Sequence, residues 1–214
     1  MSQKFLAIFI IVFVVLVGCF SYSWISFNKP SNIPVEAYKE ISFRVKVANL
    51  GLQNNSLVHG KQPTDVVEVR LPGKLYDSSK QFAPLNKQVA NRNTPIDAAV
   101  SDFSAFKADD NNWILENFVT DEQDSVRSFL DDKQAHDQNR KIFEGRTERT
   151  ITGEVTYNGY VIVFVRDTAQ THPVPVTFTE TPRGWKRTNS LSKDETFDIV
   201  FSALYNGGEI MIVK

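Results

Sequence analysis

Two segments near the start of the chain alternate apolar and polar residues with a period of two. Segment 41–47 places isoleucine, phenylalanine or valine at every second position, and segment 66–71 repeats the pattern with valine and leucine. Successive side chains of a β-strand point to opposite faces, so the alternation predicts two strands that are buried on one face. Polar, turn-rich residues lie between and after them. We expect residues 40–92 to be an N-terminal extension that adds a hairpin or an edge to a larger sheet.

The hydrophobic period then changes to that of a helix. Thr94 and Pro95 are typical of a helix start, because a threonine side chain caps free N–H groups and proline suits the first turn. Apolar residues follow at helical spacing as far as Phe106 and form one stripe. Asp97 and Asp102 fall away from this stripe on a helical wheel, so both are expected to be solvated.

Further helices are predicted on both sides of the later strands. A short helix carries the apolar residues of segment 113–118. Two capping boxes, Thr120 with Gln123 and Ser192 with Glu195, predict where a third, charged helix and the last helix begin. The last helix has a clear apolar stripe and ends at a pair of glycines.

Between those helices the period returns to two. Strands are predicted over 150–157, 160–165 and 172–181, and a short strand over 210–213 closes the chain. Asn158–Gly159 separates the first two, and this dipeptide is a strong hairpin signal because both residues tolerate positive φ. The strand over 160–165 is apolar on both faces, so we expect it in the centre of the sheet.

This order predicts an α+β domain over 93–214, with helices packed on a curved antiparallel sheet. The helical pair Thr94–Phe118, the segment Gly153–Gly159 and the Gly-Trp pair within Arg183–Lys186 resemble the nuclear-transport-factor-2-like superfamily. The resemblance covers about residues 93–190 and implies a cone, in which a curved sheet wraps around helices. The last helix and the early strands have no place in a minimal member. Members include isomerases, dehydratases and binding or assembly domains, so the resemblance implies no single function.

The N-terminal segment, residues 1–27, predicts attachment to a membrane. Leu16–Cys19 resembles a bacterial lipobox, in which a peptidase cuts before a cysteine that receives lipid, and Cys19 is the only cysteine of the chain. The alternative is an uncleaved helix over Phe5–Phe27, which carries no charge and is long enough for a hydrocarbon core that needs about 20 residues. A secretory signal that releases the domain is the third interpretation.

The lipoprotein and the spanning helix agree on topology. Each leaves a very short inner tail and places the folded part outside the cytoplasm, so we expect a membrane-anchored protein of the bacterial cell envelope with its domain in the periplasm. Residues 28–39 are predicted to be a linker, because two prolines keep it extended. The choice between inner and outer membrane stays open.

The charge balance argues against nucleic acid as a partner. The formal net charge is −1, whereas nucleic-acid binding depends on clustered lysine and arginine. Two short basic clusters are interpreted as solvated turns. They are Arg183 with Lys186 and Arg187, and Arg140 with Lys141.

No set of residues predicts catalysis, a metal or a cofactor. The three histidines, His59, His136 and His172, share no spacing typical of metal ligands. No cysteine follows Cys19, which excludes thiol catalysis in the folded part. A pocket acid or base would need a carboxylate or histidine inside the fold, and the predicted central strand carries none. We therefore expect a protein that is not an enzyme.

Large aromatic residues are the remaining candidates for a site. They line an apolar cavity or, in the alternative, fill the core as large aromatics commonly do. Arg166, at the end of the central strand, is either an anion hook in such a cavity or one half of a surface ion pair. The aromatic set is Phe103, Trp113, Phe118, Phe164, Phe178 and Trp185.

Three functions follow from these observations, in decreasing order of support. The first is a non-catalytic, membrane-tethered domain that binds a protein or another component of the cell envelope. The second is a carrier that holds a small apolar ligand in the interior of the domain. The third is an enzyme of a type that the sequence does not specify.

Overall fold

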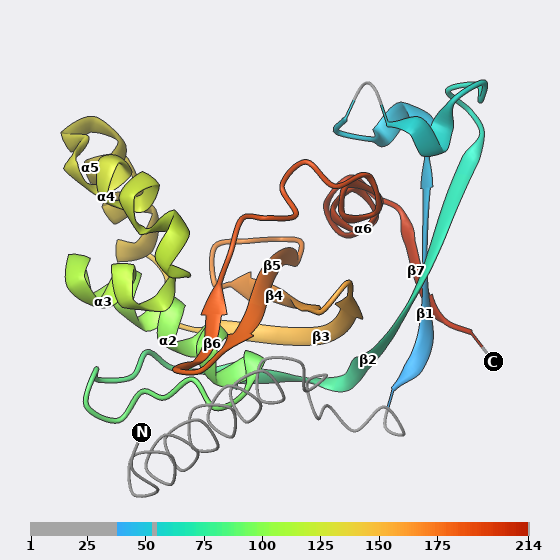
Figure 1. Cartoon of the computed structure of the whole chain (residues 1–214). Coiled ribbons are helices and arrows are strands. Elements are labelled where there is room, and N and C mark those ends of the chain that lie inside the picture. The colour runs from blue at the N-terminus through green and yellow to red at the C-terminus, as the bar shows by residue number, and fades with distance from the viewer. Residues whose placement is uncertain (1–37, 53–54, 214) are drawn as a thin grey trace, which may run out of the picture. The chain divides into compact units, whose positions relative to one another are not determined.

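One antiparallel sheet of seven strands forms the framework of the described chain (Figure 1). The computed structural model describes residues 38–52 and 55–213, and the strands lie in the order β6-β5-β4-β3-β2-β1-β7. Their bounds are β1 Lys39–Lys46, β2 Val66–Phe82, β3 Arg149–Tyr157, β4 Tyr160–Asp167, β5 Val174–Thr181, β6 Gly184–Arg187 and β7 Glu209–Ile212.

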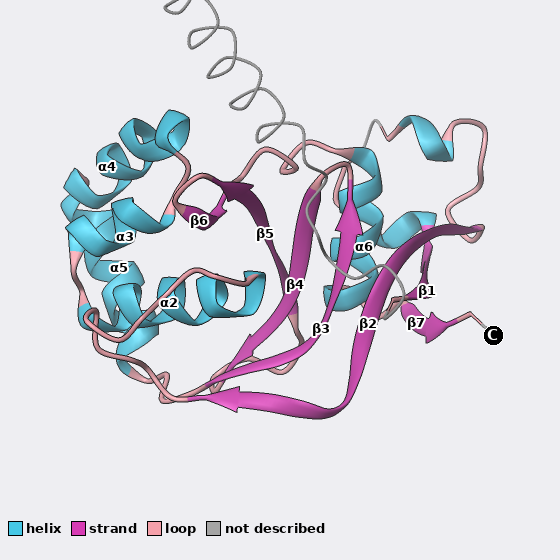
Figure 2. Ribbon diagram, turned by 60° about the horizontal axis from the view of Figure 1, so that its bottom comes forward, coloured by secondary structure: helices cyan, strands magenta, loops and turns pink. Residues whose placement is uncertain are grey.

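The α-helices of this part of the chain lie in two places (Figure 2). Helices α2 to α5 gather at the end of the sheet formed by β6, whereas α6 lies near β1 and β7. The predicted α+β class with an antiparallel sheet is therefore confirmed, and Figure 1 shows β2 bending as the sheet turns from β3 to β1. The helices are α2 Pro95–Ala108, α3 Asn111–Asn117, α4 Gln123–Asp131, α5 Lys133–Glu144 and α6 Glu195–Tyr205.

Both early strands form as predicted, and both belong to the main sheet. β1 pairs with β2 in a register that places Ile41 opposite Leu71. β2 is longer than the predicted segment 66–71, since it continues to Phe82 and pairs with β3 from Gly73 onward. One sheet thus contains strands from both predicted segments, 40–92 and 93–214.

A glycine allows β2 and β3 to approach closely where β2 bends. A Cβ atom at Gly73 would lie 2.4 Å from the backbone oxygen of Glu154, so any larger residue would push the strands apart. The register shifts between Leu75 and Lys80, which is the irregularity expected of a β-bulge.

The hairpin predicted at Asn158–Gly159 is present. Tyr157 pairs with Tyr160 across the turn, and Asn158 and Gly159 have φ values of 50° and 81°. These positive values match the two-residue turn whose twist suits the flanking strands. The predicted central strand is β4, which is buried along most of its length between β3 and β5.

One of the predicted helix starts is confirmed and another is wrong. The Thr94 side chain accepts a hydrogen bond from the backbone N–H of Asp97 and caps α2, as expected. At α6 the cap is Asp194, which accepts from the N–H of Phe197, rather than Ser192. Asp194 lies closer to the first turn, and its charge is favoured at the positive end of the helix dipole.

The second predicted capping box, Thr120 with Gln123, does not form either. A 3-10 turn occupies Thr120–Glu122, and Gln123 begins α4 without a side-chain cap before it. The Gln123 amide instead donates to the backbone oxygens of Leu115 and Phe118. The Gln123 side chain therefore pairs with backbone oxygens at the end of α3 rather than with N–H groups at the start of α4.

Two apolar cores within the described residues help to hold the elements together. The first packs α6 against strands on one side of the sheet, and Phe43 meets Phe164 there edge-to-face with ring centroids 5.8 Å apart. The second lies among helices α2 to α5 and includes Phe103, Phe106 and Phe143. Every residue of α2 from Ala98 to Phe106 is buried, because neighbouring helices cover the side that faces away from the sheet.

The predictions for the N-terminus lie outside the described residues. They concern the anchor or signal at 1–27, with Cys19 as its lipidation site, and nearly all of the linker at 28–39. Among the residues that the structure does describe, none of the helices combines the length and the apolar character needed to cross a bilayer.

Candidate functional site

The six aromatic residues proposed for a cavity are buried, but they do not surround one space. They are Phe103, Trp113, Phe118, Phe164, Phe178 and Trp185. Phe164 belongs to the core beneath α6, whereas the residues from α2 and α3 belong to the core among the helices. The structure therefore places four of the set in two separate cores, and Phe178 and Trp185 are buried outside both.

The other residues considered for chemistry also lie apart from one another. Arg166 is partly buried opposite Thr150, and no hydrogen bond or ion pair joins its side chain to another described residue. His136, on α5, lies 2.8 Å from a carboxylate oxygen of Asp109. Within residues 38–52 and 55–213, no three histidine, cysteine or acidic side chains come close enough together to hold a metal ion.

A pocket of about 290 Å³ opens instead among α2, α4, α5 and the end of β6. Phenylalanine is the commonest residue in its wall, and Arg187 is its one ionisable residue, so we call it the Arg187 pocket. Phe129 on α4 forms part of the wall and remains 39% exposed. The lining residues are Phe106, Phe118, Ser125, Val126, Phe129, Asn139, Phe143, Arg187 and Asn189.

Asp102, behind this pocket, is the main correction to the sequence analysis. It was expected to be solvated, yet it is 1% exposed. The helical wheel considered one apolar stripe, whereas α2 is covered on nearly all sides. A carboxylate in such a place must be paired or hydrogen-bonded to offset the loss of water. Asp97, in the first turn of α2, is only partly buried.

Asp102 is paired on two sides and belongs to a chain of alternating charges. Arg187 Nη1 donates to both of its carboxylate oxygens at 3.2 and 3.1 Å. Arg149 Nη1 lies 3.3 Å from Asp102 Oδ2, and Arg149 Nε donates to Asp167 at 2.8 Å. Arg146 completes the chain with a contact of 2.5 Å to Asp167.

The chain carries a surplus of positive charge, because three arginines share two aspartates. Arg149 and both aspartates are almost completely buried, while the Arg187 side chain is 28% exposed. Charges that are removed from water interact more strongly than exposed charges. Arg187 is the most exposed member of the chain, and it is also the member that lines the pocket.

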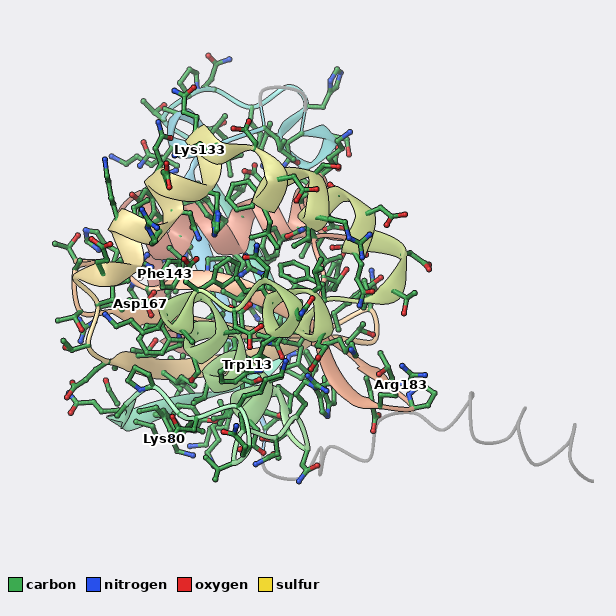
Figure 3. All side chains as sticks on the ribbon, turned by 90° about the vertical axis from the view of Figure 1, so that its left-hand side faces the viewer. Lys80, Trp113, Lys133, Phe143, Asp167 and Arg183 are labelled. Atoms are coloured by element: carbon green, nitrogen blue, oxygen red, sulfur yellow. The ribbon has the colours of Figure 1, made fainter. Side chains whose placement is uncertain are left out.

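Aromatic rings hold these arginines in place. The guanidinium carbon of Arg187 lies 5.0 Å from the ring centroid of Phe118 and 5.9 Å from that of Phe106. Arg149 stacks on Phe103 in the same way, and Arg146 on Phe143. Figure 3 shows Phe143 and Asp167, the residues that Arg146 contacts, next to each other at the base of α5. Such cation–π contacts fix a planar guanidinium without using its N–H donors.

The polar end of the pocket wall is fixed by a second carboxylate. Glu122 accepts hydrogen bonds from the backbone N–H of Asn189 at 3.0 and 2.9 Å and from the hydroxyl of Thr188. These bonds tie the segment after β6 to the start of α4. The wall thus combines aromatic side chains, held by packing, with one positioned cation, which is the composition typical of a small-molecule site.

The interpretation of Arg183, Lys186 and Arg187 as a solvated turn is wrong for two of the three. Arg183 lies exposed in the turn before β6, but Lys186 is 8% exposed and Arg187 is partly buried. From β6, Lys186 donates to the backbone oxygen of Glu116 on α3, and Arg187 donates to Asp102 on α2. One signal in the sequence did point to this strand: a tryptophan adjacent to basic residues.

Comparison with protein-family models, with curated proteins and with solved structures finds no match for this chain. The resemblance to the nuclear-transport-factor-2-like superfamily therefore stays a prediction.

Proposed function

We propose that this chain is a membrane-tethered binding domain that holds an apolar molecule with an acidic end in the Arg187 pocket. The observation that carries the proposal is the placement of one partly exposed, positively charged guanidinium in a wall of phenylalanine side chains. The apolar part of a ligand would pack on the rings. Its carboxylate would pair with Arg187, whose planar fork suits that group.

The volume of the pocket limits the size of this ligand. A water molecule takes up about 30 Å³ in the liquid, so a pocket of about 290 Å³ holds roughly ten non-hydrogen atoms. An acid such as octanoate has that size. The lining also favours binding over reaction, because arginine does not lose its proton in proteins and cannot act as a base.

The tether and the location are proposed from the N-terminal sequence. The apolar run from Phe5 and the lipobox-like Leu16–Cys19 support attachment to a bacterial membrane with the folded part in the periplasm. A domain held there would meet apolar acids and chain ends of other envelope components.

The experiment uses the full chain in a non-ionic detergent and compares octanoate with its neutral analogue octanol by calorimetry. Octanoate is expected to bind about tenfold more tightly than octanol, because a hydrogen bond to a charged group contributes about 1.5–3 kcal/mol. Arg187→Gln keeps much of the side-chain volume and should remove this preference. Equal affinity of the wild type for both compounds would contradict the proposal.

Two further variants separate binding from folding. Phe129→Ala shortens an exposed wall residue. It should weaken the binding of both compounds and have little effect on folding. Ile142→Ala is the matched control, since Ile142 is 51% exposed on α5 and does not line the pocket. It should bind both compounds as the wild type does.

A protein partner is the second candidate function, and one observation favours it. Besides Phe129 on the pocket wall, Ile142 on α5 is a second large apolar side chain that remains exposed on these helices. A partner could therefore insert an apolar C-terminal residue whose terminal carboxylate meets Arg187. A short peptide that ends in phenylalanine tests this, compared with the same peptide as a C-terminal amide. Tighter binding of the free acid than of octanoate would favour the protein partner.

A further inference from the structure

A second pocket in the described chain has a very different wall. Its volume is about 500 Å³, and its lining is mostly polar. Segment 87–93, helix α3 and the turn before β6 contribute to it. The residues that matter for its chemistry are Lys87, Arg92, Trp113, Glu116 and Arg183, and we call it the basic pocket.

The cations of this pocket outnumber its carboxylates. Lys87 is paired with Glu116 at 3.1 Å and with Asp110 at 3.7 Å. Arg92 and Arg183 form no ion pair with any carboxylate in residues 38–52 and 55–213. Both remain as uncompensated charges on the pocket wall, Arg92 before α2 and Arg183 in the turn before β6.

Lys186 adds a fourth cation next to the same wall. It is nearly buried, and its ammonium donates to the backbone oxygen of Glu116, a residue that lines the pocket. Burial lowers the pKa of Lys186, and the positive charges of Arg92 and Arg183 lower it further, against a smaller opposing effect of Glu116. The cations are therefore close enough to repel one another, and an anion between them would relieve that repulsion.

Hydrogen bonds behind the wall hold Arg92 in position. Trp113 Nε1 donates to the hydroxyl of Ser101 at 3.1 Å, and Ser101 donates to Asn117 Oδ1 at 2.9 Å. Arg92 Nη1 donates to the same oxygen at 3.1 Å. Figure 3 labels Trp113 on α3 and Arg183 in the turn before β6. The arginine is thus supported by a buried polar chain, and the pocket does not depend on surface side chains alone.

We infer that the basic pocket binds a phosphate group, with Arg92 and Arg183 as its recognition residues and the charge of Lys186 behind the wall adding to their attraction. The four cations at this site exceed the two carboxylates, Asp110 and Glu116, by two charges. A phosphate monoester carries about −1.5 to −2 at pH 7 and offers three acceptor oxygens, so it matches the surplus better than a carboxylate does. The site is independent of the proposed function, because it shares no lining residue with the Arg187 pocket.

Sulfate is the first probe, because its double charge does not change with pH in the working range. The full chain in a non-ionic detergent is titrated with sulfate at constant ionic strength, and binding is followed by calorimetry. Arg183→Gln and Arg92→Gln should each weaken sulfate binding about tenfold or more, since each removes a charged donor. Arg183 is exposed, so its variant should fold normally.

Arg127→Gln is the matched control. It removes the same charge from an exposed position on α4 that lines neither pocket. Its sulfate affinity should equal that of the wild type. The inference is wrong if all three variants bind sulfate with the same affinity. It is also wrong if the wild type does not bind sulfate more tightly than chloride.

Two further titrations distinguish the sources of a phosphate group. Inorganic phosphate stands for a soluble or polymer-borne phosphate, and monomeric dihexanoyl phosphatidylglycerol stands for a lipid headgroup. Whichever binds more tightly, with the same dependence on Arg183, identifies the source. Absence of binding by both would overturn the inference even if sulfate bound.

Discussion

At the scale of single residues, Asp102 is the position on which the helical end of the molecule depends. Its carboxylate lies between Arg149 and Arg187, one almost fully buried and the other at the pocket. An ion pair of this kind does little for stability compared with apolar packing, but removal of one member leaves a buried charge without a partner. Asp102 therefore has more influence on stability than its single charge suggests.

We predict that Asp102→Asn lowers the free energy of unfolding by about 3–5 kcal/mol, the usual loss when a buried pair is broken. Urea unfolding followed by circular dichroism measures it. Asp124→Asn is the control, because the Asp124 side chain is 96% exposed and should contribute less than about 1 kcal/mol. A loss in Asp102→Asn as small as in the control would mean that the buried chain does not constrain the fold.

Lys186 gives a prediction of pH dependence. Its pKa in the folded protein is below the ordinary value of 10.5, so between the two values the unfolded chain binds more protons. The free energy of unfolding should therefore rise with pH across that window. NMR of labelled lysine side chains measures the pKa directly. Arg183→Gln should raise it, because one repelling charge is lost, whereas Arg127→Gln should leave it unchanged.

At the scale of elements, local signals predicted well wherever one short segment determines the outcome. Thr94 with Pro95 begins a helix and Asn158–Gly159 forms a hairpin, as expected. Local signals failed where a tertiary contact competes. Gln123 is used by α3, and the carboxylate of Glu195 accepts hydrogen bonds from Ser56, so neither completes its predicted capping box.

The α6 start provides a test of that competition. Asp194→Ala removes the observed cap and should lower the free energy of unfolding by about 1 kcal/mol, a typical value for a helix N-cap. Ser192→Ala removes the cap that the sequence predicts and should change it by less than about 0.5 kcal/mol. Hydrogen exchange of the Phe197 amide should accelerate only in the Asp194 variant. The reverse order would support the sequence-based assignment.

The candidate site was less predictable than the elements. One alternative from the sequence is that the six aromatic residues fill the core, and the structure shows that all six are buried. The sequence does not reveal Arg187 and Asp102 as partners, because 85 residues separate them and both look like surface residues in their own segments. Only the packing of α2 against β6 brings them together.

At the scale of the whole folded unit, the two pockets lie at the same helical end. β6 contributes Arg187 to one wall, and the turn before it contributes Arg183 to the other. The opposite end, where α6 packs on β1 and β7, supplies most of the first apolar core. The Arg187 pocket and the basic pocket thus lie apart from the packing of α6 on the sheet.

A ligand of the Arg187 pocket should also change the stability of the whole folded unit. A ligand that binds only the folded chain stabilises it by about 2.7 kcal/mol at a hundredfold excess over its Kd. Octanoate at that excess should raise the Tm of the wild type and of Ile142→Ala. It should raise the Tm of Arg187→Gln much less at the same concentration. An equal rise in all three would place the octanoate site elsewhere.

The stacked arginines of the buried chain have a consequence for how such a sequence can diverge. Lysine would preserve the charge at 149, but its compact ammonium cannot lie flat on Phe103 while reaching both Asp102 and Asp167 as the guanidinium does. Descendants of this chain should therefore keep arginine there or lose the aspartates with it. We expect Arg149 to be replaced together with its partner aspartates, and not by lysine alone.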